Sequence, residues 1–171
     1  MTMYDTIHDL FQYRDNNLYW KVRPANRVDM SKPAGTINGR GYRSIRIKGK
    51  QYLAHRLIYL MFNELWDITD TSQDNSVDHK DEDKLNNSID NLRVATSSQQ
   101  KANRGKRNDN TSGDTGVYWD KASEKWRVQV RVNKKSHNGG LFVNKEEAIT
   151  KVTEMRDELH GEFANHGQGI K

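Results

Sequence analysis

The chain of 171 residues contains no cysteine, and only 33% of its residues are hydrophobic. The absence of cysteine excludes disulfides and zinc sites built from thiolates, and it is typical of a reducing cytosol. The small apolar fraction argues against one large core and favours compact modules joined by polar segments. No apolar run approaches the roughly 18 residues of a membrane span, and the acidic N-terminus lacks the apolar stretch of a signal peptide. We therefore expect a cytoplasmic protein that has no membrane partner.

Charge is distributed unevenly along the chain. Residues 1–50 carry a net charge of +6, residues 51–100 one of −5, and residues 101–171 one of +4. Basic segments of this kind suit a polyanion such as nucleic acid. The acidic centre would repel the same polyanion unless a cation lay between them, as in a metal-dependent nuclease. An ordinary solvated surface with uneven charge remains the alternative on this evidence.

Hydrophobic periodicity predicts short helices and short strands in alternation, and therefore an α+β fold. We expect helices over residues 3–13 and 54–64, a strand over 18–23, and a hairpin over 35–53. A strand ending at His79, a second strand over 92–96 and a helix from Ser97 should follow. Three strand-like runs come next, at 116–120, 125–132 and 139–143. A last helix is capped by Asn144 and ended by Gly161.

The most specific motif lies in residues 77–104. Asp78-His79, Asn86-Asn87 and Asn91-Leu92-Arg93 follow one another in an order and spacing that resemble the HNH nucleases, in the homing-endonuclease branch whose third motif residue is Asn. The resemblance implies a ββα-metal finger. For each of these residues alone, a surface ion pair or a turn role is the simpler interpretation.

The resemblance also implies roles in phosphodiester hydrolysis. His79 would be the general base, since a histidine titrates near neutral pH, and Asn91 would orient its ring. Asp78 would bind one divalent ion, Mg²⁺ or Mn²⁺, together with a ligand from the following helix. That ligand is Asn in the family, but the matching position here is Gln100, whose side chain is one methylene longer. Asn103 is a nearby substitute, three residues further along the helix.

Residues 112–164 resemble the AP2 DNA-binding domain, a three-stranded antiparallel sheet packed on one helix. The match rests on Gly116-Val117-Tyr118-Trp119, on Lys125-Trp126-Arg127 and on the run from Leu159 to Phe163. In the 125–132 run, alternate side chains lie on an outer face of the strand. The polar side chains of this face suit contacts in the major groove of DNA. These residues are Lys125, Arg127, Gln129 and Arg131. A solvated edge strand would show the same alternation.

The sequence thus predicts an N-terminal β-rich basic region (1–65), an HNH nuclease core (66–104), a basic linker (105–111), an AP2-like domain (112–164) and a tail (165–171). We expect a phage-type homing endonuclease acting on double-stranded DNA in a bacterial cytoplasm, as a monomer or a dimer on DNA, with no obligatory protein partner. Further predicted phosphate contacts are Arg46, Arg104, Lys106 and Arg107. Because of Gln100, a DNA-binding protein with an inactive finger is the main alternative, and an RNA-binding or structural module is a weaker one.

Overall fold

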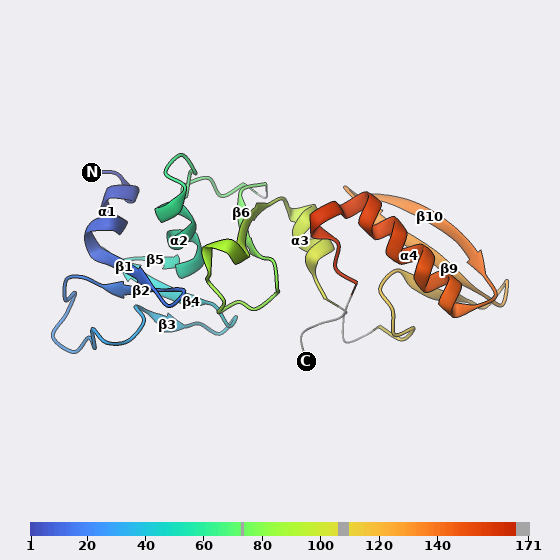
Figure 1. Ribbon diagram of the computed structural model, residues 1–171, viewed down its shortest axis with the longest axis horizontal. Coiled ribbons are helices and arrows are strands. Elements are labelled where there is room, and N and C mark those ends of the chain that lie inside the picture. Colours follow the sequence, from blue (N-terminus) through green and yellow to red (C-terminus); the bar gives the residue numbers. More distant parts are fainter. Residues whose placement is uncertain (73, 106–109, 167–171) are drawn as a thin grey trace. The chain divides into compact units, whose positions relative to one another are not determined.

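The computed structural model describes residues 1–72, 74–105 and 110–166, and the protein folds into two compact units, residues 1–94 and 95–171 (Figure 1). Both units contain helices and small sheets, which confirms the α+β class. Each unit has a hydrophobic core of its own, as the low apolar content predicts. Among the described residues, no helix is long and apolar enough to cross a membrane.

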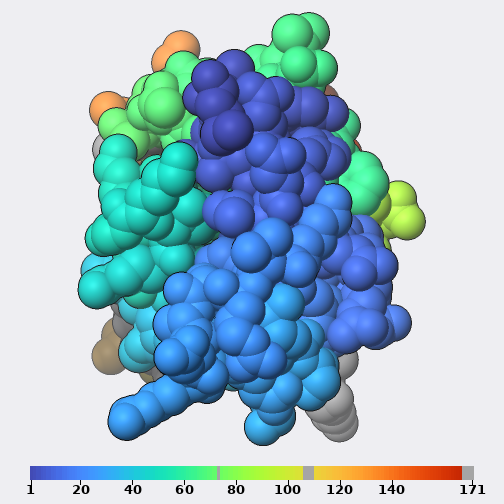
Figure 2. All heavy atoms as spheres, turned by 90° about the vertical axis from the view of Figure 1, so that its left-hand side faces the viewer, coloured from blue at the N-terminus to red at the C-terminus, as the bar shows by residue number. Residues whose placement is uncertain are grey.

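The first unit combines two helices with three small sheets. Strands β1 and β2 form a hairpin, β4 lies between β3 and β5 in a three-stranded sheet, and β6 pairs with β7. Residues of β1, of β2 and of the loop that follows make up much of the face in Figure 2. The elements are α1 (Met3–Leu10), β1 (Phe11–Arg14), β2 (Asn17–Trp20), β3 (Thr36–Ile37), β4 (Arg43–Ile47), β5 (Lys50–Leu53), α2 (Ala54–Phe62), β6 (Ser76–His79), the 3-10 turn η1 (Ile89–Asn91) and β7 (Leu92–Ala95).

Three boundaries in this unit differ from the sequence prediction. The helix expected over 3–13 ends at Leu10, because the next residues pair with β2 across a two-residue turn, Asp15-Asn16, whose φ angles are 48° and 57°. The strand expected over 18–23 ends at Trp20 for the same reason, since pairing with β1 stops there. Helix α2 ends at Phe62, which is half exposed instead of facing the core.

The second unit is a three-stranded antiparallel sheet with one long helix against it, as expected. Strand β9 lies in the middle between β10 and β8, and α4 contacts all three strands (Figure 1). Its elements are α3 (Ser97–Asn103), β8 (Val117–Asp120), β9 (Lys125–Val132), β10 (Lys135–Phe142), α4 (Lys145–His160) and the 3-10 turn η2 (Gly161–Phe163). The core comprises Val117, Val128, Val130, Ala148, Val152 and Met155.

Strand β10 begins four residues earlier than expected because Asn133 and Lys134 form a tight hairpin turn with positive φ angles. Gly116, just before β8, has a φ of 87°, and a Cβ there would lie 2.8 Å from Val152 Cγ2. Only glycine meets both conditions. As predicted, the Asn144 side chain caps α4, and Gly161, with a φ of 54°, ends it.

By its contacts, helix α3 groups with residues 95–171, and it lies within the range 66–104 that the sequence analysis assigned to the nuclease core. Ala102 packs with Ala95 and Phe163 in a small apolar cluster, and the buried Arg156 of α4 donates a hydrogen bond to Ala102 O at 3.1 Å. A helix of only seven residues is not stable alone. These contacts, all within residues 95–171, decide which unit it joins.

Candidate functional site

The candidate site lies at the end of β6. Alternation along this strand buries His79, which is 4% exposed, and turns Asp78 to the other side. The loop from residue 80 to 91 then returns the chain to β7, and Lys80 N donates to Asn91 O at 2.9 Å to close it. The Tyr13 hydroxyl fixes this loop from β1, because it donates to Asn87 O and accepts from Ile89 N, both at 3.3 Å. The motif histidine is therefore buried beside a loop that hydrogen bonds hold closed.

Asn87 is the side chain that contacts the His79 ring. His79 Nε2 lies 3.0 Å from Asn87 Oδ1, and Asn87 is itself only 1% exposed. With the amide oxygen toward the ring, this contact requires the tautomer in which Nε2 carries the hydrogen and donates it. This tautomer leaves Nδ1 as the ring's proton acceptor. The arrangement suits a general base whose orientation is set by a buried partner.

Two further rings pack against His79. The His55 ring of α2 lies 4.8 Å from it between centroids at an interplanar angle of 73°, and the Tyr42 ring lies 6.1 Å away. His55 is 4% exposed. Burial, and then the neighbouring His79 and Arg56, lower the pKa of His55 to about 3. His55 is therefore neutral near pH 7 and packs against His79.

Asn91 does not make the contact expected of it. Its Nδ2 donates to Asp81 Oδ1 and to Asn86 O, both at 2.8 Å, and its Oδ1 accepts from Asp81 N at 3.2 Å. Both ends of the amide are thereby engaged within the loop. Asn87 therefore makes the contact that orients the ring. Asn91 stabilises the conformation of the loop that carries Asn87.

The Asp81 carboxylate accepts several of the hydrogen bonds that hold this loop. It accepts from Asn86 Nδ2 at 2.6 Å, from Asn91 Nδ2 and from the backbone N–H of Asp83. Burial by itself raises the pKa of this carboxyl, but these hydrogen bonds outweigh it, so the pKa lies below its ordinary value. Asp81 therefore stays ionised and keeps the loop closed across the neutral pH range.

Asp78, the predicted metal ligand, is partly exposed and lies beside Arg93 of β7. The distance from Arg93 NH2 to Asp78 Oδ2 is 3.6 Å, and the exposed fractions of the two side chains are 10% and 17%. Within the described ranges, no group of three or more His, Asp or Glu side chains could hold a metal ion. Mg²⁺ typically takes one or two protein carboxylates and completes its shell with water and substrate phosphate. Asp78 fits that use.

Gln100, the other predicted ligand, lies in α3 of the second unit and is half-buried. Its neighbour Gln99 is occupied with the capping box of this helix, since Gln99 Oε1 accepts from Thr96 N at 2.7 Å. Asn103, the alternative, is 5% exposed, and its carbonyl accepts from Asn165 Nδ2. Burial argues against Asn103 as a ligand. The pairing of Asp78 with Gln100 stays a prediction.

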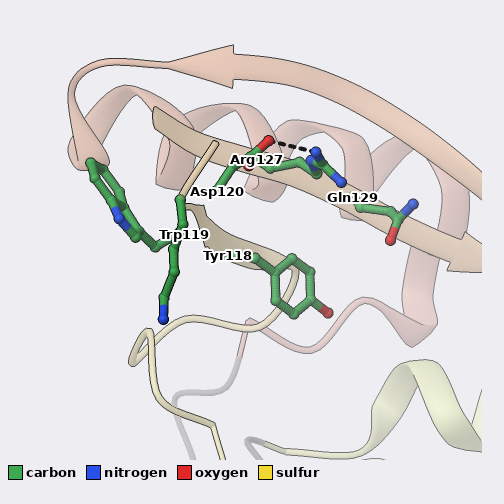
Figure 3. Close-up of a pocket in the computed structure, with 6 residues that line it drawn as sticks. Tyr118, Trp119, Asp120, Arg127 and Gln129 are labelled. Atoms are coloured by element: carbon green, nitrogen blue, oxygen red, sulfur yellow. Dashed lines mark hydrogen bonds and ion pairs between the residues drawn. The ribbon is translucent and has the colours of Figure 1, made fainter. Parts of the chain in front are cut away.

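A second candidate surface is the face of the three-stranded sheet that α4 leaves open. The alternation in β9 is as predicted, with Val128 and Val130 buried and Arg127, Gln129 and Arg131 exposed. Lys125 is half-buried. A hollow on this face is lined by Tyr118, Trp119, Asp120, Lys121, Arg127 and Gln129 (Figure 3). Trp119 also contacts Trp126, at 5.1 Å between ring centroids, and is about half exposed.

The other predicted phosphate contacts lie at separate places. Arg46 is exposed in β4 between the buried Ile45 and Ile47. Arg104 is exposed at the end of α3. Lys106 and Arg107 lie outside the described residues. The charges of Arg46 and Arg104 are compatible with nucleic-acid binding, and their positions give no further support for it.

The sequence analysis assigned no role to Asn87, His55 or Asp120. Asn87 lies within the HNH motif, so its type and position pointed to the site. The spacing of twelve residues from His79 favoured Asn91 as the ring-orienting residue instead. The contact of His55 with His79 depends on how α2 packs on β6. No local pattern marks Asp120.

Comparison with known proteins supports the first site. Residues 71–102 match the family model described as HNH endonuclease, a range that contains Asp78, His79, Asn87, Asn91 and Gln100. The chain is similar to Protein 3.8 of Escherichia phage T7, with 38% identity over 90 residues, which cover 52% of this chain and 72% of the phage protein. No solved structure matches.

Proposed function

Since the chain belongs to the family of phage T7 Protein 3.8 and carries an HNH endonuclease domain, we propose that it is a metal-dependent DNA endonuclease with His79 as general base. The observation that carries the proposal is the hydrogen bond from His79 Nε2 to Asn87 Oδ1. It orients a buried imidazole at the end of β6, and Asp78 precedes His79 directly in this strand.

The resemblance to HNH nucleases implies the course of the reaction. His79 Nδ1 takes a proton from a water molecule as the water oxygen attacks phosphorus, and Asn87 keeps the ring oriented while it becomes positive. The bond from phosphorus to the 3′-oxygen breaks, and that oxygen takes a proton from solvent. The products carry 5′-phosphate and 3′-hydroxyl ends. One base per chain predicts nicking by a monomer, or double-strand cutting when two chains act together.

Asp78 would hold the divalent ion, Mg²⁺ or Mn²⁺, through its carboxylate, and Gln100 is the residue that the resemblance gives as the second ligand. When bound, such an ion offsets negative charge on the phosphate and on the leaving oxygen. Arg93, 3.6 Å from Asp78, keeps the carboxylate paired before DNA arrives. The resemblance to homing endonucleases of phage type further suggests a bacterial cytoplasm as the place of action.

We also propose that the second unit binds duplex DNA through the open face of its sheet, in the manner that the AP2 resemblance implies. Three basic side chains and one amide of β9 share this face, namely Lys125, Arg127, Arg131 and Gln129. Arginine and glutamine have the donor pattern for guanine and adenine in the major groove, and lysine neutralises phosphate.

Cleavage of supercoiled plasmid tests the enzyme. The protein is incubated with plasmid and Mg²⁺, Mn²⁺ or EDTA, beside His79→Ala and the exposed control His166→Ala. We expect nicked plasmid with either metal, none in EDTA, none with His79→Ala, and normal nicking with the control. Equal nicking by wild type and His79→Ala would exclude His79 as the base.

Gln100 favours a second candidate function, a DNA-binding protein whose nuclease finger is inactive. The Gln100 amide is one methylene farther from the backbone than the amide of the Asn in the family. Because the distance from oxygen to metal is fixed, this longer side chain weakens the contact. Metal-dependent cutting separates the two functions, whereas DNA affinity does not. If wild type binds duplex without cutting and Gln100→Asn restores cutting, the second function holds.

A further inference from the structure

One exposed lysine joins the loop that follows β6 to the turn that precedes β4. Lys84 Nζ donates to Arg40 O at 3.0 Å and lies 5.1 Å from the centre of the Tyr42 ring. The same ring lies 6.1 Å from the His79 ring between centroids. Tyr42 thus contacts both the proposed base and the lysine. An ammonium group is therefore held one aromatic ring away from His79.

Hydrogen bonds hold the turn in one conformation. Asn38 Oδ1 accepts from Arg40 N at 2.9 Å and from Tyr42 N at 3.1 Å, and Gly41 N donates to Asn38 O at 2.9 Å. Gly41 has a φ of 83°, which glycine adopts without strain. These bonds use the Asn38 side chain and the backbone, while the Arg40 side chain is exposed. The turn therefore supports the carbonyl that receives Lys84 and presents Arg40 beside it.

Neither Lys84 nor Arg40 forms an ion pair with a carboxylate in the part of the chain that the structure describes. The three residues before Lys84 are acidic, yet its hydrogen bond goes to the turn instead. One such bond leaves two of the three ammonium hydrogens for another acceptor. Residues 51–100 carry a net charge of −5, so DNA that reaches His79 needs cations close by. These two side chains are placed to supply them.

We propose that Lys84 and Arg40 bind a phosphate of the strand that is cut, next to the phosphate that is attacked, and so position the substrate at His79. This rests on the proposed function, since it takes His79 as the base. The guanidinium can pair with two phosphate oxygens, and the ammonium group adds a point charge. Because the Tyr42 ring contacts both Lys84 and His79, a phosphate held by the lysine fixes the place of its neighbour at the base.

Four substitutions separate charge from structure. Arg40→Gln removes a charge and keeps the backbone carbonyl that accepts from Lys84. Lys84→Met removes a charge and also the bond between loop and turn, whereas Lys84→Arg keeps the charge. Lys21→Met is the matched control, because Lys21 is exposed in the same unit and its Nζ donates to a backbone carbonyl, His8 O, at 2.7 Å. Circular dichroism checks the fold of each variant.

Binding and turnover are measured on the full-length protein. In EDTA, loss of one phosphate contact should lower the slope of log K against log salt by about 0.9 in Arg40→Gln and in Lys84→Met. In Mg²⁺, plasmid nicking by these two variants should show a KM raised roughly tenfold and a kcat little changed, since a contact made before and during the reaction is uniform binding. Lys84→Arg and Lys21→Met should behave as wild type. A merely structural role for Lys84 would lower kcat instead, because its loop carries Asn87.

Uncharged phosphate analogues locate the contact. Once the cut is mapped by sequencing the nicked ends, short duplexes carry one methylphosphonate, at each position beside the cut in turn. At one position the analogue should raise the KM of wild type and of Lys21→Met. At that position it should raise the KM of Lys84→Met no further, because the lysine and the charge act on each other.

The outcomes distinguish this contact from the nuclease function. If wild type nicks plasmid but the salt slope and KM of Arg40→Gln and Lys84→Met are unchanged, the phosphate contact is wrong and the nuclease stands. A lower kcat at unchanged KM in Lys84→Met, an equal effect of Lys21→Met, or methylphosphonate effects that add fully to Lys84→Met at every position would also overturn the contact. If wild type nicks nothing with Mg²⁺ or Mn²⁺, the proposed function is wrong and the contact beside the cut fails with it.

Discussion

The imidazole rings of His55 and His79 lie 4.8 Å apart between centroids, with their planes at 73°, in the interior of the first unit. His55 is the second residue of helix α2, and His79 ends the strand β6. Burial of two imidazoles side by side is favourable only when at least one is neutral. The pKa of about 3 for His55 meets this condition and makes the contact sensitive to acid.

We therefore expect acid to destabilise the protein through His55. Its folded-state pKa of about 3 lies below the ordinary histidine value of 6.5, so its contribution to stability is complete above pH 6.5 and is lost as pH falls toward 3. The free energy of unfolding should fall by at most about 1.4 kcal/mol per pH unit in this window. Urea unfolding of wild type and His55→Gln between pH 7.5 and 4 measures it. Parallel pH profiles for the two proteins would contradict the prediction, and exposed His166→Gln is the control.

Asn87 should matter to turnover more than to binding. Asn87→Leu has a similar volume but cannot accept the hydrogen bond from His79 Nε2, so the ring loses its fixed tautomer and orientation. We expect kcat to fall roughly 10- to 100-fold, as when outer partners of metal-binding histidines are removed, with KM little changed. Plasmid nicking at several DNA concentrations gives both constants. An unchanged kcat in a folded variant would show that Asn87 does not orient the base.

The buried Arg156 should be essential to the second unit. It is 6% exposed and donates from NH2 to Ala102 O and to Asn165 O, so it joins α3 and the C-terminal segment to α4. Arg156→Met leaves two carbonyls without their donor, at a cost of about 1–3 kcal/mol each. Thermal unfolding should show a lower midpoint for Arg156→Met. Lys151→Met, at a partly exposed position of the same helix, should change it little. Equal unfolding midpoints for Arg156→Met and wild type would mean that water replaces the hydrogen bonds that the guanidinium donates to the two carbonyls.

The salt dependence of duplex binding should separate the arginines of β9. Loss of a phosphate contact lowers the slope of log K against log salt by about 0.9. We expect this for Arg131→Gln, and a smaller change for Arg127→Gln, because Asp120 already offsets the charge of Arg127. Fluorescence anisotropy with one labelled duplex in EDTA, over a series of salt concentrations, provides the slopes. Equal slopes for the two variants would show that Arg127 also neutralises phosphate.

Local patterns predicted the parts of the fold that depend on local chemistry. The alternation in β9 buries Val128 and Val130 because successive side chains of a strand point to opposite faces. The cap of α4 at Asn144 and its end at Gly161 follow from backbone geometry within one turn. The predicted helix over 3–13 was too long, since apolar spacing over so few residues does not distinguish a helical turn from a short strand.

The sequence by itself determined the α+β class, the order of the elements and the presence of an HNH motif around Asp78 and His79, because each depends on residue type and spacing. The tertiary structure alone decided that Asn87 contacts the His79 ring, that His55 packs against it, that α3 joins the second unit and that Asp120 holds Arg127. The physical reason is that these contacts depend on how loops close and how elements pack. A buried polar group must find its partner in space, and spacing along the chain does not say which of several suitable side chains will be there.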